Sequence, residues 1–77
     1  PAVYSIEEIR KHDNPQDLWM IIYNKVYNIT NFSQDHPGGA EVLFDCGGID
    51  ATEPFEDVGH LEHALNMLHP YYIGDLD

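Results

Sequence analysis

Two histidines stand at glycine-marked junctions where an imidazole could act as a metal ligand. The first begins the run His36-Pro37-Gly38-Gly39, and the second, His60, directly follows Gly59. Pro37 stiffens the backbone beside the first imidazole, and the two glycines remove side chains from the next stretch. A flat group such as a porphyrin needs this kind of close approach to the backbone. The alternative is an ordinary turn, because Pro and Gly are common turn formers.

Apolar residues surround the two histidines in the sequence. Two pairs of short helices, residues 31–46 and 54–68, would each hold one imidazole at its bend and together form a crevice with the two rings facing each other. The apolar side chains of this stretch could line a cofactor pocket: Phe32, Val42, Leu43, Phe55, Val58, Leu65 and Leu68. Each of these side chains taken singly could equally be an ordinary residue of the hydrophobic core that contacts no cofactor.

The first part of the chain predicts a helix followed by a hairpin. Ser5 and Glu8 form a capping-box pattern at the start of a short helix that fades near residues 13–15. Residues 19–23 and 26–29 are rich in β-branched and aromatic side chains and predict two strands. Asn24-Lys25 would form the turn, because Asn tolerates the positive φ that such a turn needs.

The second part predicts helices that are too short to be stable alone. Segments 31–34, 40–46, 54–58 and 62–68 are bounded by Gly or Pro, and residues 71–73 before Gly74 predict a closing strand. Helices of this length need packing on each other or on a bound group. His12 and His69 fall at predicted helix ends, where a solvated or capping role is expected.

Composition limits the classes of function. The 77 residues predict one domain, 1–77, and Cys46 is the single cysteine, which excludes an intramolecular disulfide. The formal net charge of −11 makes nucleic acid a poor partner and would steer basic proteins toward the acidic face. It also keeps a small domain soluble, and we expect a monomer. No apolar run is long enough to span a bilayer, so we expect no membrane insertion by this segment.

The motifs together resemble the cytochrome b5 family. The resemblance rests on Trp19, on the two runs that contain His36 and His60, and on three further segments. The full set is Trp19, Lys25-Val26-Tyr27-Asn28-Ile29-Thr30, His36-Pro37-Gly38-Gly39, Gly47-Gly48 to Asp50-Ala51-Thr52-Glu53, Phe55-Glu56-Asp57-Val58-Gly59-His60 and Tyr72-Ile73-Gly74-Asp75-Leu76. The match spans essentially the whole chain, and the combination of the two histidine motifs is highly specific.

The resemblance implies an α+β fold in which a small mixed sheet carries two pairs of short helices that form a heme crevice. It implies a non-covalent b-type heme (iron protoporphyrin IX) with His36 and His60 as iron ligands, and Pro37, Gly38 and Gly39 against the ring. The absence of a Cys-x-x-Cys-His run agrees with non-covalent attachment. Two imidazoles leave no open position on the iron, so we expect a one-electron carrier and not an enzyme. Such a carrier could be a domain of an oxidoreductase or a donor to one.

Acidic residues crowd the segments around both histidines, and in this family they imply docking of basic redox partners. These residues are Glu41, Asp45, Asp50, Glu53, Glu56 and Asp57. The implied partners are a cytochrome c-like protein and a flavin reductase, bound through salt-sensitive contacts. The alternative is a solvated face without partner preference. We expect a cytoplasmic location, or the cytosolic face of a membrane if an anchor has been removed, since the chain opens at Pro1 and trimming at either end stays open.

One position departs from the family pattern. The residue after the second histidine is commonly a Ser that caps the next helix and bonds a heme propionate, but here it is Leu61, which does neither. We therefore expect one propionate contact to be missing.

Two rival interpretations remain at this stage. His36, His60, His63 and Cys46 could be imagined as a zinc site, although zinc sites favour closely paired ligands and only His60 and His63 are close in sequence. A heme or sterol module without redox function would not require two opposed histidines. His63 lies one helical turn after His60 and is a conceivable alternative ligand, although surface exposure is the simpler expectation.

Overall fold

The fold is built on one five-stranded mixed sheet. The computed structural model describes residues 2–35, 43–57 and 61–77. The strands follow the order β1-β5-β4-β3-β2, and their bounds are β1 (Ala2–Tyr4), β2 (Asp13–Asn14), β3 (Asp17–Ile22), β4 (Lys25–Asn28) and β5 (Tyr72–Leu76). β1 runs parallel to β5, whereas the other neighbouring strands are antiparallel. The predicted α+β class with a small mixed sheet is confirmed.

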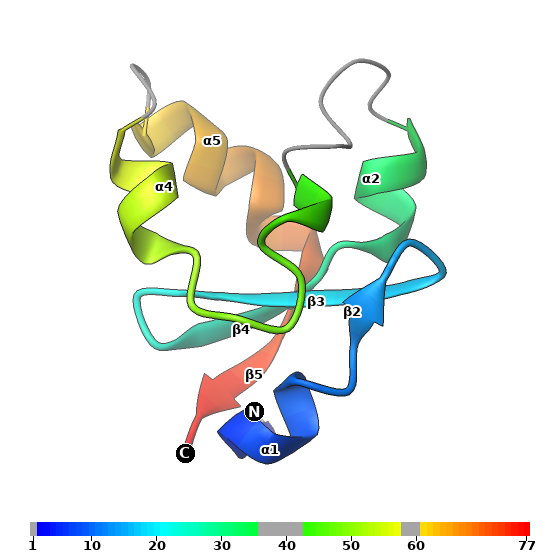
Figure 1. Cartoon of the computed structure of the whole chain (residues 1–77). Coiled ribbons are helices and arrows are strands. Elements are labelled where there is room, and N and C mark those ends of the chain that lie inside the picture. Colours follow the sequence, from blue (N-terminus) through cyan, green and yellow to red (C-terminus); the bar gives the residue numbers. More distant parts are fainter. Residues whose placement is uncertain (1, 36–42, 58–60) are drawn as a thin grey trace.

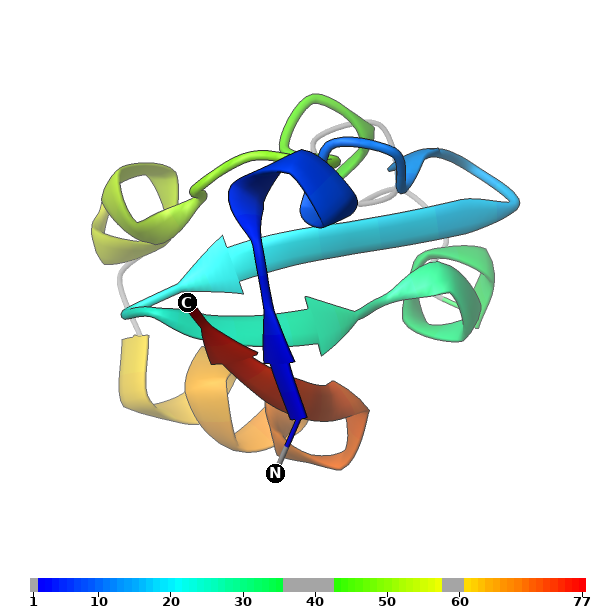
Figure 2. The same ribbon diagram turned by 90° about the horizontal axis from the view of Figure 1, so that it is seen from below.

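The helices lie on the two faces of this sheet. Three of them, α2 (Thr30–Asp35), α4 (Thr52–Glu56) and α5 (Leu61–Leu68), rise from one face, and α1 (Ile6–Ile9) lies on the other (Figure 1). Seen from below, α1 is in front of the strands (Figure 2). A 3-10 turn, η1 (His69–Tyr71), joins α5 to β5. Within the described ranges, no helix has the length and apolar character needed to cross a membrane.

Strand β3 is the centre of the core because it is buried on both faces. Successive side chains of a strand point to opposite faces, so Leu18, Met20 and Ile22 belong to one apolar cluster and Ile21 to another. The first cluster lies under α2 and α5 and includes Leu43 and Leu68. The second joins Ile9 of α1 to Ile21 and Val26 of the hairpin.

The hairpin is confirmed, but its turn lies one residue earlier than the sequence predicted. Ile22 pairs with Lys25, so the two turn residues are Tyr23 and Asn24, with φ of 51° and 62°. Two consecutive positive φ angles are typical of the type I′ turn, whose twist matches that of the flanking strands. The register also places Ile21 opposite Val26 and Met20 opposite Tyr27, which keeps each apolar pair on its own face of the sheet.

The predicted helices form with shifted ends. α2 and α5 each begin one residue earlier than predicted, and α4 spans Thr52–Glu56 instead of 54–58. Of the predicted helix 40–46, residues 40–42 lie outside the described ranges, and the helical part ends at Phe44 before a turn over 45–48. Gly48 closes that turn at φ +74°, a conformation that suits a glycine after a helix.

His12 has a structural role that the sequence did not predict. Instead of being a solvated residue at a helix end, it stacks on Trp19 with the ring centroids 3.6 Å apart. Its Nδ1 lies 2.7 Å from Asp17 Oδ2, and its Nε2 lies 2.8 Å from Glu8 Oε2. Only the protonated ring can donate from both nitrogens at once. The imidazolium therefore links the end of α1 to the start of β3.

The surroundings of His12 make the stability of the fold depend on pH. Burial alone would lower the pKa of His12, but the hydrogen bonds to Asp17 and Glu8 outweigh it and raise the pKa above the ordinary value of 6.5. In return, the bond to His12 lowers the pKa of the Glu8 carboxyl. A raised pKa in the folded state means that the contribution of His12 to stability is complete below pH 6.5 and is lost as the pH rises through the folded value.

We predict that His12→Gln destabilises the protein more at pH 6 than at pH 9. Urea unfolding followed by circular dichroism at both values measures the difference in the free energy of unfolding. His69→Gln is the matched control, because His69 is exposed and its replacement should give the same small effect at both values. An equal loss for His12→Gln at both pH values would contradict the role assigned to the imidazolium.

Candidate functional site

The two histidines of interest adjoin the helices on one face of the sheet. His36 directly follows the last residue of α2, and His60 directly precedes the first residue of α5. The end of α2 and the start of α5 both lie at the end of the molecule remote from α1 (Figure 1). His36 and His60 themselves lie outside the described residues, as do these other predicted site residues: Pro37, Gly38, Gly39, Glu41, Val42 and Val58.

Thr30 fixes α2 to the sheet. Its hydroxyl accepts a hydrogen bond from the backbone N–H of Leu18 at 2.9 Å and donates one to Asn28 Oδ1 at 2.7 Å. The backbone N–H of Ile29 donates to the carbonyl of Leu18 at 2.8 Å, and one turn into the helix the Ser33 hydroxyl donates to the Thr30 carbonyl at 2.8 Å. The start of α2 is therefore bonded directly to the start of β3.

The segment before α4 is bonded to the edge of β3 opposite β4, next to the part that pairs with β2. Gly48 N–H donates to the Trp19 carbonyl at 2.7 Å, and Ala51 N–H donates to the Ile21 carbonyl at 2.7 Å. Ile21 N–H in turn donates to the carbonyl of Ile49 at 3.0 Å. Gly47 lets this segment approach, because a Cβ there would collide with Leu18. These bonds place α4 opposite α2 across the same face of the sheet (Figure 1).

Two of the predicted docking residues hold α4 in position. The Asp50 carboxylate accepts hydrogen bonds from the backbone N–H and the hydroxyl of Thr52 at 2.9 and 2.6 Å. Glu56 Oε2 accepts one from the Tyr23 hydroxyl at 3.1 Å. This contact ties α4 to the hairpin turn. These roles could not be predicted from the sequence. The Tyr23 donor to Glu56 lies in a distant segment, and the Thr52 donors to Asp50 depend on where the helix begins.

The described pocket residues of the prediction gather on this face. Leu43 and Leu68 are buried in the cluster under the helices, and Phe32, Phe55 and Leu65 are partly buried against it. The ring of Phe32 meets Tyr71 edge to face, with centroids 5.3 Å apart. Residues that the prediction omitted supply the floor of the site: Met20, Ile22 and Ile29, all fully buried. Within the predicted strand 19–23, Met20 and Ile22 are two residues apart and therefore share one face, which is the signal that could have indicated them.

The zinc alternative finds no support among the described residues. Cys46 is buried in the same cluster, and burial, with a smaller effect of Asp45, raises the pKa of its thiol. A neutral buried thiol is a poor zinc ligand, because zinc binds the thiolate. His63 is exposed on α5. No three His, Cys, Asp or Glu side chains cluster as a metal site within the ranges that the structure describes.

The comparisons with known proteins agree with this architecture. The sequence pattern of the "Cytochrome b5-like Heme/Steroid binding domain" family matches residues 5–77. The chain belongs to the cytochrome b5 family. It is 56% identical over 75 residues to cytochrome b5 of Rhizopus stolonifer and 49% identical over 77 residues to cytochrome b5 of Saccharomyces cerevisiae. These alignments cover 97% and 100% of this chain but 57% and 64% of those relatives.

A solved structure confirms the cytochrome b5 fold. Cytochrome b558 of Ectothiorhodospira vacuolata, titled a prokaryotic homologue of cytochrome b5, superposes with a TM-score of 0.86 at 34% identity. The alignment covers 97% of this chain and 98% of that one. The sheet and the helices on it are therefore those of a cytochrome b5 domain.

The described part of the site fits the heme that the cytochrome b5 family implies. A porphyrin needs apolar walls that exclude water, and Phe32, Phe55 and Leu68 supply such walls from three different helices. The helices are held by the sheet and by few contacts of their own, since α4 has no buried residue and α5 buries only Leu68. An apolar group between them would supply the contacts that these helices lack.

The structure corrects the position of Leu61. We expected it to precede the helix at the capping position, but α5 begins at Leu61 itself. A side-chain oxygen at the first helical residue is not in the capping position. The argument that Leu61 costs the protein a helix cap is therefore wrong, and only the proposed propionate contact remains.

We predict that Leu61→Ser slows the transfer of heme to apomyoglobin a few-fold. The added hydroxyl would donate to a propionate, and a hydrogen bond to a charged group contributes about 1.5–3 kcal/mol before exposure to water reduces it. Leu61→Ala is the matched control, because it removes the apolar side chain without adding a donor. Equal rates of heme transfer for Leu61→Ser and Leu61→Ala, or a faster rate for Leu61→Ser than for the unsubstituted protein, would contradict the propionate contact.

Proposed function

We propose that this domain is a one-electron carrier that holds a non-covalent b-type heme between His36 and His60. The observation that carries the proposal is the arrangement of the two helix ends. α2 ends at Asp35 and α5 begins at Leu61, so each histidine is joined to an anchored helix on the same apolar face of a cytochrome b5 fold.

The chemistry follows from the two imidazoles. With both axial positions filled, the iron of a bound heme exchanges single electrons and has no open position for oxygen or substrate. The protein would position the ligands through the helices that adjoin them. Thr30 bonds α2 to β3, and the segment before α4 bonds to the edge of β3. Phe32, Phe55 and Leu68 keep water from the site, which lowers the reorganisation that accompanies a change of charge.

Non-covalent attachment is supported by the cysteine content. Covalent c-type attachment uses a Cys-x-x-Cys-His run, whereas Cys46 is the single cysteine of the chain and is followed by two glycines. Cys46 is buried under the helices, and no histidine follows it directly in the sequence. Apolar contacts and iron ligation would therefore hold the heme.

The partners that we propose are basic redox proteins. Asp45, Asp50, Glu53, Glu56 and Asp57 are all exposed, and the chain carries a net charge of −11. A surface of this sign attracts a basic partner such as a cytochrome c-like acceptor and a flavin reductase as donor. Asp50 and Glu56 already accept hydrogen bonds, so Glu53 and Asp57 are the better candidates for docking contacts.

We predict that the protein binds one heme per chain with a six-coordinate, low-spin visible spectrum. His36→Ala and His60→Ala should each abolish that spectrum, because removal of one axial ligand opens a coordination position. His63→Ala is the matched control, since His63 is exposed on α5, and it should leave the spectrum intact. A low-spin spectrum that survives in His60→Ala but disappears in His63→Ala would overturn the assignment of the second ligand.

A further inference from the structure

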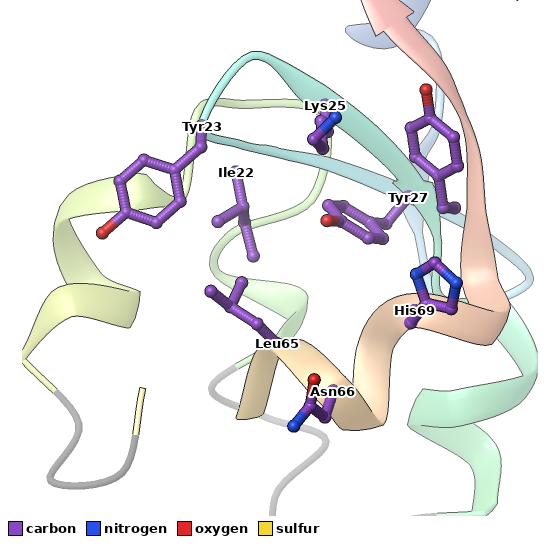
Figure 3. Close-up of a pocket in the computed structure, with 8 residues that line it drawn as sticks. Ile22, Tyr23, Lys25, Tyr27, Leu65, Asn66 and His69 are labelled. Carbon is purple, nitrogen blue, oxygen red and sulfur yellow. The ribbon is translucent and has the colours of Figure 1, made fainter. Parts of the chain in front are cut away.

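A separate cavity lies between the turn end of the hairpin, α5 and the start of β5. Its volume is about 270 Å³. Ile22 points from the hairpin toward Leu65, which points toward it from α5, and Asn66 and His69 lie along the α5 side (Figure 3). Among the described residues that form it, Leu65 is the one that belongs to our predicted heme-lining set. Small-molecule sites usually enclose about 300–1,000 Å³, so this cavity suits a ligand far smaller than a porphyrin.

The side chain of Tyr27 is buried, but its hydroxyl opens onto the cavity and has no hydrogen-bond partner among the described residues. Tyr27 is 6% exposed, yet its hydroxyl makes no hydrogen bond to any residue in the described part of the chain. The hydroxyl is directed into the cavity, toward the side formed by Ile22 and Leu65 (Figure 3). A bound ligand or a water in this cavity would supply the missing acceptor.

Lys25 gives the cavity a charge opposite to that of the whole chain. Lys25 and Tyr27 are two residues apart on β4 and therefore share a face of the sheet. The Lys25 ammonium lies 4.0 Å from Asp75 Oδ1 and 5.3 Å from the centre of the Tyr72 ring. Asp75 Oδ1 also accepts a hydrogen bond from the Tyr72 hydroxyl at 2.8 Å. The ammonium thus has donors left for a ligand.

The described lining contains no carboxylate. The chain has fourteen Asp and Glu residues, but none of the described residues that form the cavity is acidic. Four of the described lining residues can donate a hydrogen bond, although the amide and the imidazole can also accept one: Lys25, Tyr27, Asn66 and His69. Burial raises the pKa of Tyr27, so its hydroxyl keeps its proton and stays a donor.

We propose that this cavity binds a small organic carboxylate with an apolar body. The carboxylate would accept hydrogen bonds from Lys25 and Tyr27, and the apolar body would pack on Ile22 and Leu65. One carboxylate can reach both donors, because side chains two residues apart on a strand are about 7 Å apart at their bases. A ligand of this size is expected to bind with a dissociation constant of about 1 mM. The proposal does not depend on which residues ligate iron.

The test uses a matched pair of probes on the heme-loaded, reduced protein. We expect 3-phenylpropanoate to cause saturable amide shifts at residues 22–27 and 65–69 in nitrogen-15 correlation spectra. The neutral 3-phenylpropan-1-ol has the same body without the charge and should bind at least about threefold more weakly. Shifts centred elsewhere, no saturable shifts, or equal affinities for the two probes would overturn the proposal. A change in the heme absorption spectrum would also overturn it, because the probe would then act at the iron.

Two variants and one control assign the binding to the named donors. Lys25→Gln should weaken the binding of 3-phenylpropanoate at least about fivefold and leave the binding of the alcohol nearly unchanged. Tyr27→Phe removes only the hydroxyl and should also weaken the binding of 3-phenylpropanoate. Lys11→Gln removes the same charge at a side chain that is 72% exposed and does not line the cavity. The affinity of this variant for 3-phenylpropanoate should stay within about twofold of that of the unsubstituted protein. Equal losses for Lys25→Gln and Lys11→Gln would mean that only net charge matters, which would overturn the assigned site.

Discussion

The structure depends on the burial of β3 on both of its faces. Leu18, Met20 and Ile22 face one cluster, and Ile21 faces the other. A strand whose side chains are apolar on both faces must be covered twice, and this requirement brings α1 to one side and the three longer segments of helix to the other. Its hydrogen-bonding edges are covered as well, by β4 on one side and by β2 and residues 48–51 on the other.

The same strand positions the proposed heme site. Its first residues bond to Thr30 at the start of α2, and its later residues bond to the segment that leads into α4. α2 and the segment before α4 are thus both bonded to the same strand, β3. This arrangement explains how helices of five to eight residues, which are unstable alone, could carry the two proposed ligands. The proposed cofactor would fill the space between them.

The parts of the fold that local signals determine could be predicted from the sequence. Ser5 accepts a hydrogen bond from the Glu8 N–H at 3.1 Å, as the capping pattern indicated, and the hairpin forms from the two predicted runs of β-branched and aromatic residues. β1 has three residues and is defined by its pairing with the distant β5. β2 has only two residues and pairs with the adjacent β3. The turn was placed one residue late because Asn24 fits either turn position.

His12 was missed because its partners Asp17 and Trp19 meet it only after the chain folds back. The described apolar residues of the predicted pocket pack in one cluster, whose buried members Met20 and Ile29 were not predicted.

The central claim, that the sheet is self-sufficient and the proposed heme supplies the core of the helical side, can be tested most directly by amide hydrogen exchange with and without heme. Local protection reports the free energy of local opening. The account predicts that the amides of β3 and β4 keep their protection in the heme-free protein, whereas those of α2, α4 and α5 lose most of theirs. Equal protection of these three helices in both forms would contradict it.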